Sequence, residues 1–434
     1  YSSIIADFFA RSKKIQGSNV FFLTGTDEHG LKIQRAAEKK GMSPKDFCDE
    51  ISITFRELSK TLNLTNNDFI RTTEERHFKS VQNLWNILEK KNEIYLSKYS
   101  GWYSVSDEAF YTDDEVENID GVRKSKISSS LVEWVEEESF FFKLSKWEKP
   151  LLKFYDENPK FILPESRRNE VISFVKSGLK DLSVSRKSFS WGIKVPSNDQ
   201  HVIYVWLDAL TNYLSALNYP DVKDKLFKDF WPASLHLIGK DILRFHAVYW
   251  PAFLLAANIP LPKRVYGHGW ILSGEEKMSK SKGNILDPIE IIKEYGLDPL
   301  RYYLIKEVSF GSDGSISREK LEDTINSDLA NNFGNLCQRV TAFNQKNCNS
   351  KIPEFSFTND DFSILNKFSK NIDKIRHAMD KQNLNFYVDF IINSLFEANK
   401  YFNDQEPWKK KNDTKRLNTI VYTALEIIRK IAIL

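Results

Sequence analysis

Cysteine is scarce in this chain of 434 residues. Its three cysteines, Cys48, Cys337 and Cys348, are scattered and include no C-x-x-C pair. Neither a disulfide framework nor a cysteine zinc knuckle is therefore indicated, and a reducing compartment, the cytoplasm, is expected.

Long apolar runs are lacking too. The longest, Val248 to Ala257, is interrupted by Pro251 and is too short to span a bilayer, and the first residues do not have the layout of a signal peptide. An excess charge of one sign is also missing, because 62 basic and 59 acidic residues leave a net charge of only +3. A polybasic coat for nucleic acid is excluded, whereas local basic patches are not.

What the chain does contain is a globular balance of 41% hydrophobic and 28% charged residues. Its length exceeds one ordinary core and predicts two to four domains. Strand-like runs separated mostly by helical patterns predict an α/β fold with a doubly wound parallel sheet; they are Val20–Leu23, Val202–Trp206, Leu235–Ile238 and Val265–Leu272. Helix starts are expected where a capping residue precedes proline, at Ser43, Asp287 and Asp298.

Changes of pattern along the chain predict five segments. Short aromatic and acidic stretches between about 92 and 186 indicate an inserted α+β subdomain, and helical periodicity alone after 319 indicates a bundle. The expected boundaries are 1–91 and 187–263 for the two halves of the sheet domain, 92–186 for the insertion, 264–318 for a lysine-rich loop region, and 319–434 for the bundle. The bundle helices are expected at 319–347, 359–381, 384–403 and 415–434.

The segment Asn19–Gly30 reads as a buried strand that runs into a polar turn bounded by glycines. Ligands of open α/β sheets bind at the carboxyl ends of the strands, where Asp27 could hold an ammonium group. The alternative is that these polar residues only cap a helix, with His29 a structural histidine.

Two helical faces suggest a pocket for an apolar side chain. Trp206, Ala209, Leu210 and Tyr213 share one face, and Ile242 and His246 share another. Both begin at carboxyl ends of expected strands, and their mixture of aromatic, apolar and polar groups suits a thioether. Such faces are nevertheless more often plain core.

The stretch Lys277-Met278-Ser279-Lys280-Ser281, followed by Lys282 and Gly283, offers lysine ammonium groups and hydroxyl donors to a polyphosphate. The alternative is a solvated lysine-rich turn.

In the expected bundle, Asn335 and Arg339 lie four residues apart, and Pro407 and Trp408 precede three lysines. Asn and Arg can read base edges and an exposed tryptophan can stack on an unpaired base. Composition alone favours the alternative, in which Trp408 packs between helices and the lysines are solvated.

Taken in order, these residues resemble the methionyl-tRNA synthetases, which are class I aminoacyl-tRNA synthetases, over essentially the whole chain. Lys277 to Ser281 spell the KMSKS signature of that class. The other segments that carry the resemblance are FFLTGTDEHG (21–30), GWYSVSDEAFYT (101–112), RRNEVISFV (167–175), YVWLDALTNY (204–213), HLIGKDILRFHAVYWPAFL (236–254), HGWILSGEEKMSKSKGN (268–284), DLANNFGNLCQR (328–339) and EPW (406–408).

The resemblance implies a Rossmann-like catalytic core and a reaction in two steps. Methionine attacks the α-phosphate of ATP, bound with Mg²⁺, to give methionyl adenylate, and the methionyl group then passes to the terminal ribose of initiator and elongator methionine tRNAs. The implied roles are Asp27 for the ammonium group; Trp206, Ala209, Leu210, Tyr213, Ile242 and His246 for the side chain; Gly267, His268, Gly269 and Lys277 to Ser281 for ATP; Lys277, Ser279 and Lys280 for catalysis; and Asn335, Arg339, Pro407 and Trp408 for the CAU anticodon.

Two departures from the family pattern matter. The HIGH motif that contacts ATP in this family is absent, so we expect a fragment, cut at both ends, with impaired activation. Ser104 and Asp107 stand at the spacing of one cysteine pair of the family's zinc knuckle, and we expect no zinc.

Relatives with other specificities fit less well. The insertion is too short for the editing domains of the isoleucine, valine and leucine enzymes, and zinc ligands expected of a cysteine enzyme are lacking. The alternative from a different class is a non-catalytic tRNA-binding paralogue, against which KMSKS, Asp27 and the pocket residues argue. The oligomeric state is left open.

Overall fold

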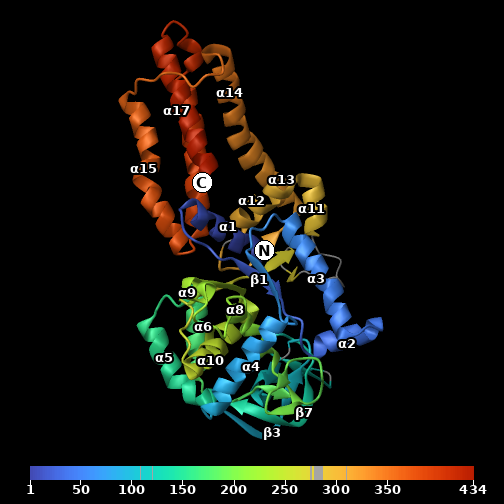
Figure 1. Ribbon diagram of the computed structural model, residues 1–434. Coiled ribbons are helices and arrows are strands. Elements are labelled where there is room, and N and C mark those ends of the chain that lie inside the picture. Colours follow the sequence, from blue (N-terminus) through green and yellow to red (C-terminus); the bar gives the residue numbers. More distant parts are fainter. Residues whose placement is uncertain (108, 120, 274–275, 278–286, 309) are drawn as a thin grey trace. The chain divides into compact units, whose positions relative to one another are not determined.

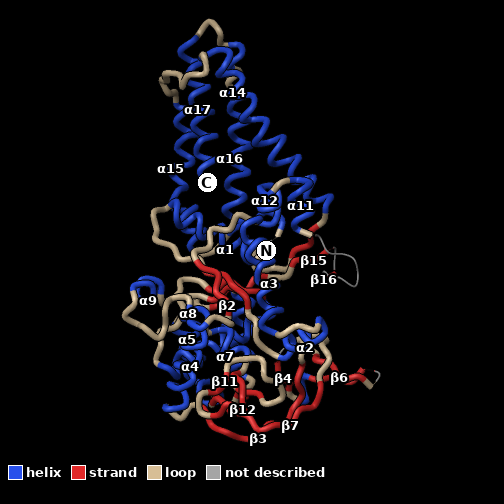
Figure 2. Tube along the Cα trace, turned by 45° about the vertical axis from the view of Figure 1, so that its right-hand side comes forward, coloured by secondary structure: helices blue, strands red, loops and turns tan. Residues whose placement is uncertain are grey.

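The computed structural model describes residues 1–107, 109–119, 121–273, 276–277, 287–308 and 310–434, which form two compact units (Figures 1 and 2). The larger unit consists of Ser2 and Asn19–Gly267, and the smaller unit of Tyr1, Ser3–Ser18 and His268–Leu434. The mixture of parallel strands and helices confirms the predicted α/β class. The five segment boundaries stay a prediction.

Parallel strand pairs in the larger unit form the framework of the expected sheet domain. β1 (Leu23–Thr26) pairs in parallel with β2 (Asp68–Arg71), and β14 (Val265–His268) lies between β13 (His236–Gly239) and β8 (Ile162–Leu163), with β14 and β8 parallel. The accompanying helices are α2 (Leu31–Lys40), α3 (Pro44–Thr61), α4 (Glu75–Lys90), α5 (Glu148–Glu157), α6 (Glu165–Lys176), α7 (Val205–Leu210), α8 (Asn212–Ser215), α9 (Lys225–Phe230) and α10 (Trp250–Ala257).

Antiparallel strands make up the rest of the larger unit. A four-stranded sheet has the order β4 (Ala109–Tyr111), β3 (Ile94–Ser104), β7 (Glu133–Phe142) and β9 (Leu182–Ser183), and β5 (Val116–Ile119) pairs with β6 (Val122–Ser125). β12 (Asn198–Ile203) lies between β10 (Ser185–Arg186) and β11 (Lys194–Val195). One extensive core of fully buried side chains, among them Trp85, Phe142 and Phe253, joins strands and helices of this unit.

Long antiparallel helices dominate the smaller unit (Figure 1). They are α14 (Asn335–Cys348), α15 (Asn359–Asp380), α16 (Leu384–Asp404) and α17 (Thr414–Ile433), around a core that includes Leu336, Leu395 and Ile427. The unit also contains α1 (Ser2–Ile15), α11 (Pro288–Tyr295), α12 (Leu297–Glu307), α13 (Arg318–Thr324), a π-helix at Ile325–Gly334 and the strands β15 (Ile271–Ser273), β16 (Glu276–Lys277) and β17 (Gly314–Ile316).

Two of the three expected helix starts are confirmed. Ser43 and Asp287 accept hydrogen bonds from backbone N–H groups of the first turn, and the prolines that follow them begin α3 and α11. The third is wrong, because α12 begins at Leu297 after Gly296, which has a φ of 93°. Asp298 and its proline therefore lie inside the first turn, where neither disturbs the helix.

Two expected strands are displaced. The first begins only at Leu23, because the side chain of Asn67 takes the hydrogen bond of the Phe22 N–H where a strand partner would be. β12 ends at Ile203 and is antiparallel to its neighbours, and Trp206 belongs to α7 instead.

The expected strand Val265–Leu272 is divided in two. A Cβ on Gly269 would lie 2.1 Å from the carbonyl oxygen of Ser312, and the N–H of Trp270 donates to the side chain of Asp313 at 2.8 Å. These contacts with a neighbouring segment interrupt the strand between His268 and Ile271.

Candidate functional site

The loop after β1 presents one acidic side chain outward and buries its next two polar residues. Asp27 is exposed, whereas Glu28 and His29 are only 4% and 3% exposed. The loop follows the carboxyl end of a parallel strand, as the sequence predicted. The strand pair is tight here, since a Cβ on Gly25 would lie 2.0 Å from the carbonyl oxygen of Ile70 on β2.

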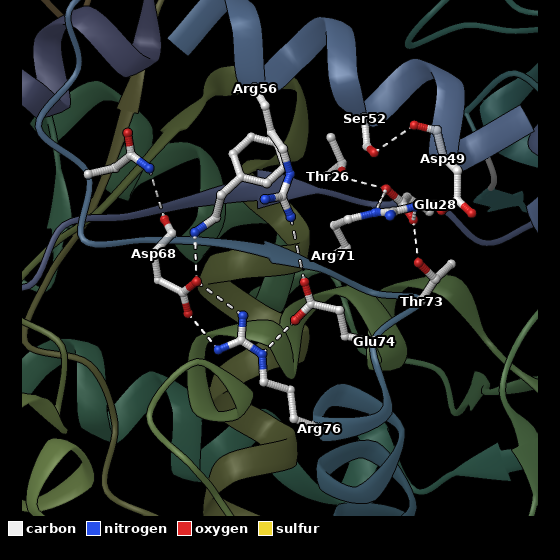
Figure 3. Close-up of polar contacts among 12 residues, drawn as sticks. Thr26, Glu28, Asp49, Ser52, Arg56, Asp68, Arg71, Thr73, Glu74 and Arg76 are labelled. Carbon is white, nitrogen blue, oxygen red and sulfur yellow. Dashed lines mark hydrogen bonds and ion pairs between the residues drawn. The ribbon is translucent and has the colours of Figure 1, made fainter. Parts of the chain in front are cut away.

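A buried ion pair holds Glu28 in place (Figure 3). The Arg71 guanidinium donates Nε–H to Oε1 at 2.8 Å and Nη2–H to Oε2 at 3.0 Å, and the Thr26 and Thr73 hydroxyls donate to the same carboxylate. Arg71 also donates to Asp49 on α3 at 2.6 Å. Paired and fully hydrogen-bonded buried charges are rigid, so this clamp fixes the loop against β2 and α3.

His29 is held by a second buried group. Its Nδ1 lies 2.7 Å from Oδ2 of Asp208 on α7, and Oδ1 of Asp208 lies 2.7 Å from Nε2 of His77 on α4. The backbone of the loop is fixed by Trp191, whose indole N–H donates to the Glu28 carbonyl at 2.6 Å. Asp208 was assigned no role from the sequence, although it belongs to the helix that carries expected pocket residues.

The expected pocket residues come together in the larger unit. Tyr213 Oη lies 2.8 Å from Nε2 of His246, and Nδ1 of His246 lies 3.0 Å from the carbonyl oxygen of Ile242. The carbonyl can only accept, so His246 carries its proton on Nδ1 and Nε2 accepts from the tyrosine. Leu210 is buried in the core of this unit, Trp206 and Ile242 pack against that core half-buried, and Ala209 is buried on the same helix as Leu210.

Burial keeps this group of residues uncharged. It lowers the pKa of His246 to about 4 and lowers the pKa of neighbouring His236 well below its usual range, where a proton on His246 would add repulsion. Burial likewise raises the pKa of the Tyr213 hydroxyl. A lining of neutral polar tips and aromatic rings suits an apolar, polarizable ligand.

Sequence reasoning missed Phe245. Its ring stacks on that of Trp206 with 3.8 Å between centroids and 7° between planes, so it belongs to the same cluster. Phe245 and His246 lie in a π-helix, Phe245–Tyr249, to which the 3.6-residue spacing used to predict helical faces does not apply.

The expected ATP-binding residues are only partly described. Gly267 and the buried His268 end β14. Gly269 packs against the backbone of Ser312 too closely for any side chain. Lys277 belongs by its backbone to β16, while Met278, Ser279, Lys280 and Ser281 lie outside the described residues.

The expected anticodon residues lie on neighbouring parts of the helical bundle. Arg339 on α14 donates to Asn403 on α16 and stands over the ring of Phe402, 5.6 Å from its centroid. Phe402 in turn packs edge-on against Trp408. Asn335 is exposed one turn before Arg339, and Pro407 is buried. Trp408 is 41% exposed, so packing between helices covers only part of its side chain.

At the spacing of the family's cysteine pair, the structure has a hydrogen-bonded carboxylate. Asp107 accepts from Tyr111 at 2.7 Å, from Ser130 at 2.8 Å and from Ser128, and its backbone N–H donates to Ser104. Burial would raise the pKa of Asp107, but these hydroxyl donors hold it below its usual value. Hydroxyls around one carboxylate thus tie the segments 104–111 and 128–130 together.

In the part of the chain that the structure describes, no group of three or more His, Cys, Asp or Glu side chains is arranged to hold a metal ion. No helix in it is both long enough and apolar enough to cross a membrane.

Comparison with known proteins assigns the family. The model for "tRNA synthetases class I (M)" matches residues 1–341. A methionine–tRNA ligase of Rickettsia felis is 51% identical over 439 residues, covering 100% of this chain and 85% of that protein, and one of Brucella suis is 49% identical, covering 100% and 84%. The chain belongs to the methionyl-tRNA synthetase family.

A solved structure agrees with this assignment. Methionyl-tRNA synthetase of Mycobacterium tuberculosis, bound by methionyl adenylate, superposes with a TM-score of 0.97 at 44% identity, covering 100% of this chain and 86% of that one. The predicted Rossmann-like class I fold and the predicted reaction, ATP-dependent ligation of methionine to tRNA, are confirmed by the family. ATP, methionine and tRNA are accordingly its substrates.

Proposed function

We propose that the Asp27 loop and the pocket around Tyr213 and His246 form the methionine site of this ligase. The observation that carries the proposal is the division of labour in the loop. Asp27 faces outward, while its neighbours Glu28 and His29 are buried and clamped. A carboxylate presented on a rigid loop suits the substrate ammonium group.

The thioether would lie among Trp206, Ala209, Leu210, Tyr213, Ile242 and His246. Since His246 and Tyr213 satisfy each other's hydrogen bonds, the polar atoms left without a partner here are ring nitrogens of Trp206 and His236, and none of them offers an opposite charge to a charged side chain. Such a side chain would lose its hydration without compensation, which favours methionine over polar amino acids of similar length.

ATP, entering as its Mg²⁺ complex, would be held by Gly267, His268 and Gly269 and by Lys277, Met278, Ser279, Lys280 and Ser281. Lysine ammonium groups beside the β- and γ-phosphates would stabilise the charge that develops on pyrophosphate as the methionine carboxylate attacks. No covalent enzyme intermediate is required, so positioning and electrostatic stabilisation supply the rate. Lys280 is our choice for the larger effect.

The anticodon would be read by Asn335, Arg339, Pro407 and Trp408. The exposed face of Trp408 can stack on an unpaired base, and Arg339, anchored over Phe402, can reach a base edge. Initiator and elongator methionine tRNAs share the CAU anticodon and would both be substrates. Function in the cytoplasm, without a zinc ion, completes the proposal.

The test is amino-acid-dependent ATP–pyrophosphate exchange by the full-length gene product, with the twenty amino acids tried one at a time. Exchange with methionine alone, lost in Asp27→Ala and slowed about 10²-fold in Lys280→Ala, is expected. Exchange that is unchanged in Asp27→Ala would overturn the ammonium role. A folded protein that binds tRNA but exchanges with no amino acid would identify the non-catalytic paralogue instead.

A further inference from the structure

We propose that Asp208 is a positioning residue that sets the separation between the two halves of the methionine site, the Asp27 loop and the pocket helix α7. The inference rests on the proposed roles of Asp27 and of the pocket residues. It assigns to a buried carboxylate, which would not touch the substrate, a part in selecting substrates by length.

The geometry places Asp208 between the two halves. It belongs to α7 together with three proposed pocket residues, Trp206, Ala209 and Leu210, and its carboxylate accepts from His29, two residues after Asp27, at 2.7 Å. The side chains of His29 and Asp208 are 2% and 0% exposed, so water does not compete for this bond.

The Glu28 clamp does not duplicate this connection. Arg71 and Thr73 tie Glu28 to β2 and to the residues just after it, and Asp49 extends the cluster to α3 (Figure 3). These contacts fix the loop to the sheet, whereas the bond from His29 to Asp208 fixes it to α7. If that bond is weakened, the Asp27 loop and the pocket helix α7 each stay folded, but the distance between them is no longer fixed.

The hydrogen bonds around Asp208 demand a carboxylate. Both oxygens accept, Oδ2 from His29 and Oδ1 from His77 on α4. His77 is anchored on its other side, because its Nδ1 lies 2.9 Å from the Ser215 hydroxyl oxygen.

An isosteric substitution of Asp208 changes its charge and its hydrogen bonds while keeping its volume. In Asp208→Asn, one of the two accepting oxygens becomes an NH₂ group that faces an N–H donor. The volume of the side chain is kept, so the packing of α7 is preserved while the connection to the loop is weakened.

The experiment compares two ligands by direct titration of the full-length gene product. Methioninol contains the ammonium group, the hydroxyl and the thioether; its deamino analogue lacks the ammonium group and keeps the other two. We expect Asp208→Asn to weaken methioninol binding about tenfold, because a displaced Asp27 can no longer bind the ammonium group well while the thioether is in the pocket. Binding of the deamino analogue, which makes no contact through an ammonium group, should change by less than about twofold. Preference for methioninol over its homologue with one more methylene should fall as well.

Variants of His29 supply the matched pair. His29→Asn can keep an N–H donor near the position of Nδ1 and should bind methioninol nearly as the wild type does, whereas His29→Ala should behave like Asp208→Asn. Should Asp208→Asn fail to fold, this pair decides the question.

Three outcomes separate the explanations. Equal weakening of both ligands in Asp208→Asn and His29→Ala would overturn the proposal and make Asp208 a packing residue. The preference for methioninol over its deamino analogue could also be lost in Asp27→Asn and kept in both Asp208→Asn and His29→Ala. That result would overturn the positioning role of Asp208 and leave the ammonium role of Asp27 intact. Retention of that preference in Asp27→Asn would remove the proposed role of Asp27, and this proposal with it.

Discussion

Trp408 has the exposure that a base-stacking residue needs and an internal contact that holds it in place. It is 41% exposed and meets Phe402 edge-on at 6.3 Å. Because stacking on a base is worth about 1–3 kcal/mol, Trp408→Ala should lower kcat/KM for tRNA charging by that amount and leave pyrophosphate exchange unchanged. Trp408→Phe, which keeps an aromatic face, should retain most of the activity. Equal charging by all three proteins would return Trp408 to a packing role.

His246 makes stability depend on pH. Its pKa is lowered by burial from 6.5 to about 4, so between these values the unfolded chain binds a proton that the folded chain does not. Stability is therefore full above pH 6.5 and falls as the pH drops towards 4, by at most about 3 kcal/mol from this residue.

Urea unfolding between pH 7 and pH 5 would measure this loss. His246→Gln, whose amide oxygen can still accept from Tyr213, should lose less stability than the wild type over the same interval. Part of the loss should persist in that variant, because the pKa of His236 is lowered as well. An identical pH dependence in the two proteins would contradict the assignment to His246.

The buried ion pair between Glu28 and Arg71 lies close to ion pairs that Arg76 makes with Asp68 and Glu74 nearer the solvent, which allows a controlled comparison (Figure 3). Arg71→Met would leave the carboxylate of Glu28, 5% exposed at its side chain, buried without its partner, and should cost about 3–5 kcal/mol of unfolding free energy. Arg76→Met breaks ion pairs with Asp68 and Glu74 that are partly open to solvent and should cost about 1 kcal/mol or less.

Chemical denaturation of both variants provides the measurement. Arg71→Met should also raise the methionine KM more than the ATP KM, because the Asp27 loop loses the two hydrogen bonds that Arg71 donates to Glu28 and is held less firmly against β2. Similar stability losses in the two variants would mean that burial does not set the strength of the Glu28 pair.

Elements with a long regular pattern could be predicted from the sequence. The helices of the bundle, such as α15 and α16, agree with the expected ranges to within a residue or two. The single helix expected at 319–347 is broken by the π-helix Ile325–Gly334, because hydrophobic spacing does not distinguish closely related helical geometries.

The grouping of the candidate pocket residues could be predicted from the sequence, whereas the contacts that connect them to the rest of the unit could not. Trp206, Tyr213 and His246 were found from faces of helices, and the structure brings them together. Asp208 and Phe245 were missed because their roles depend on partners distant in sequence, His29 and Trp206. Strand ends were misplaced for the same reason, since the side chain of Asn67 decides where β1 begins.

Methionine binding and anticodon reading are proposed for different compact units. The residues proposed for methionine, Asp27 and the pocket around Tyr213, all lie in the larger unit, and those proposed for the anticodon lie in the smaller unit. Methionine binding and anticodon reading should therefore be separable by substitution. Trp206→Ala should raise the methionine KM in pyrophosphate exchange far more than the ATP KM, whereas Trp408→Ala should leave both unchanged.

The double variant tests this division. Substitutions that share no partners usually add in free energy to within about 0.5 kcal/mol, and Trp206 and Trp408 pack in different cores, the first against Phe245 and the second against Phe402. The loss of kcat/KM for charging in Trp206→Ala/Trp408→Ala, measured at subsaturating methionine and tRNA, should equal the sum of the two single losses. A larger or smaller loss by more than about 1 kcal/mol would mean that anticodon binding and the methionine pocket are energetically coupled. The separate roles proposed for the two units would then have to give way to a joint one.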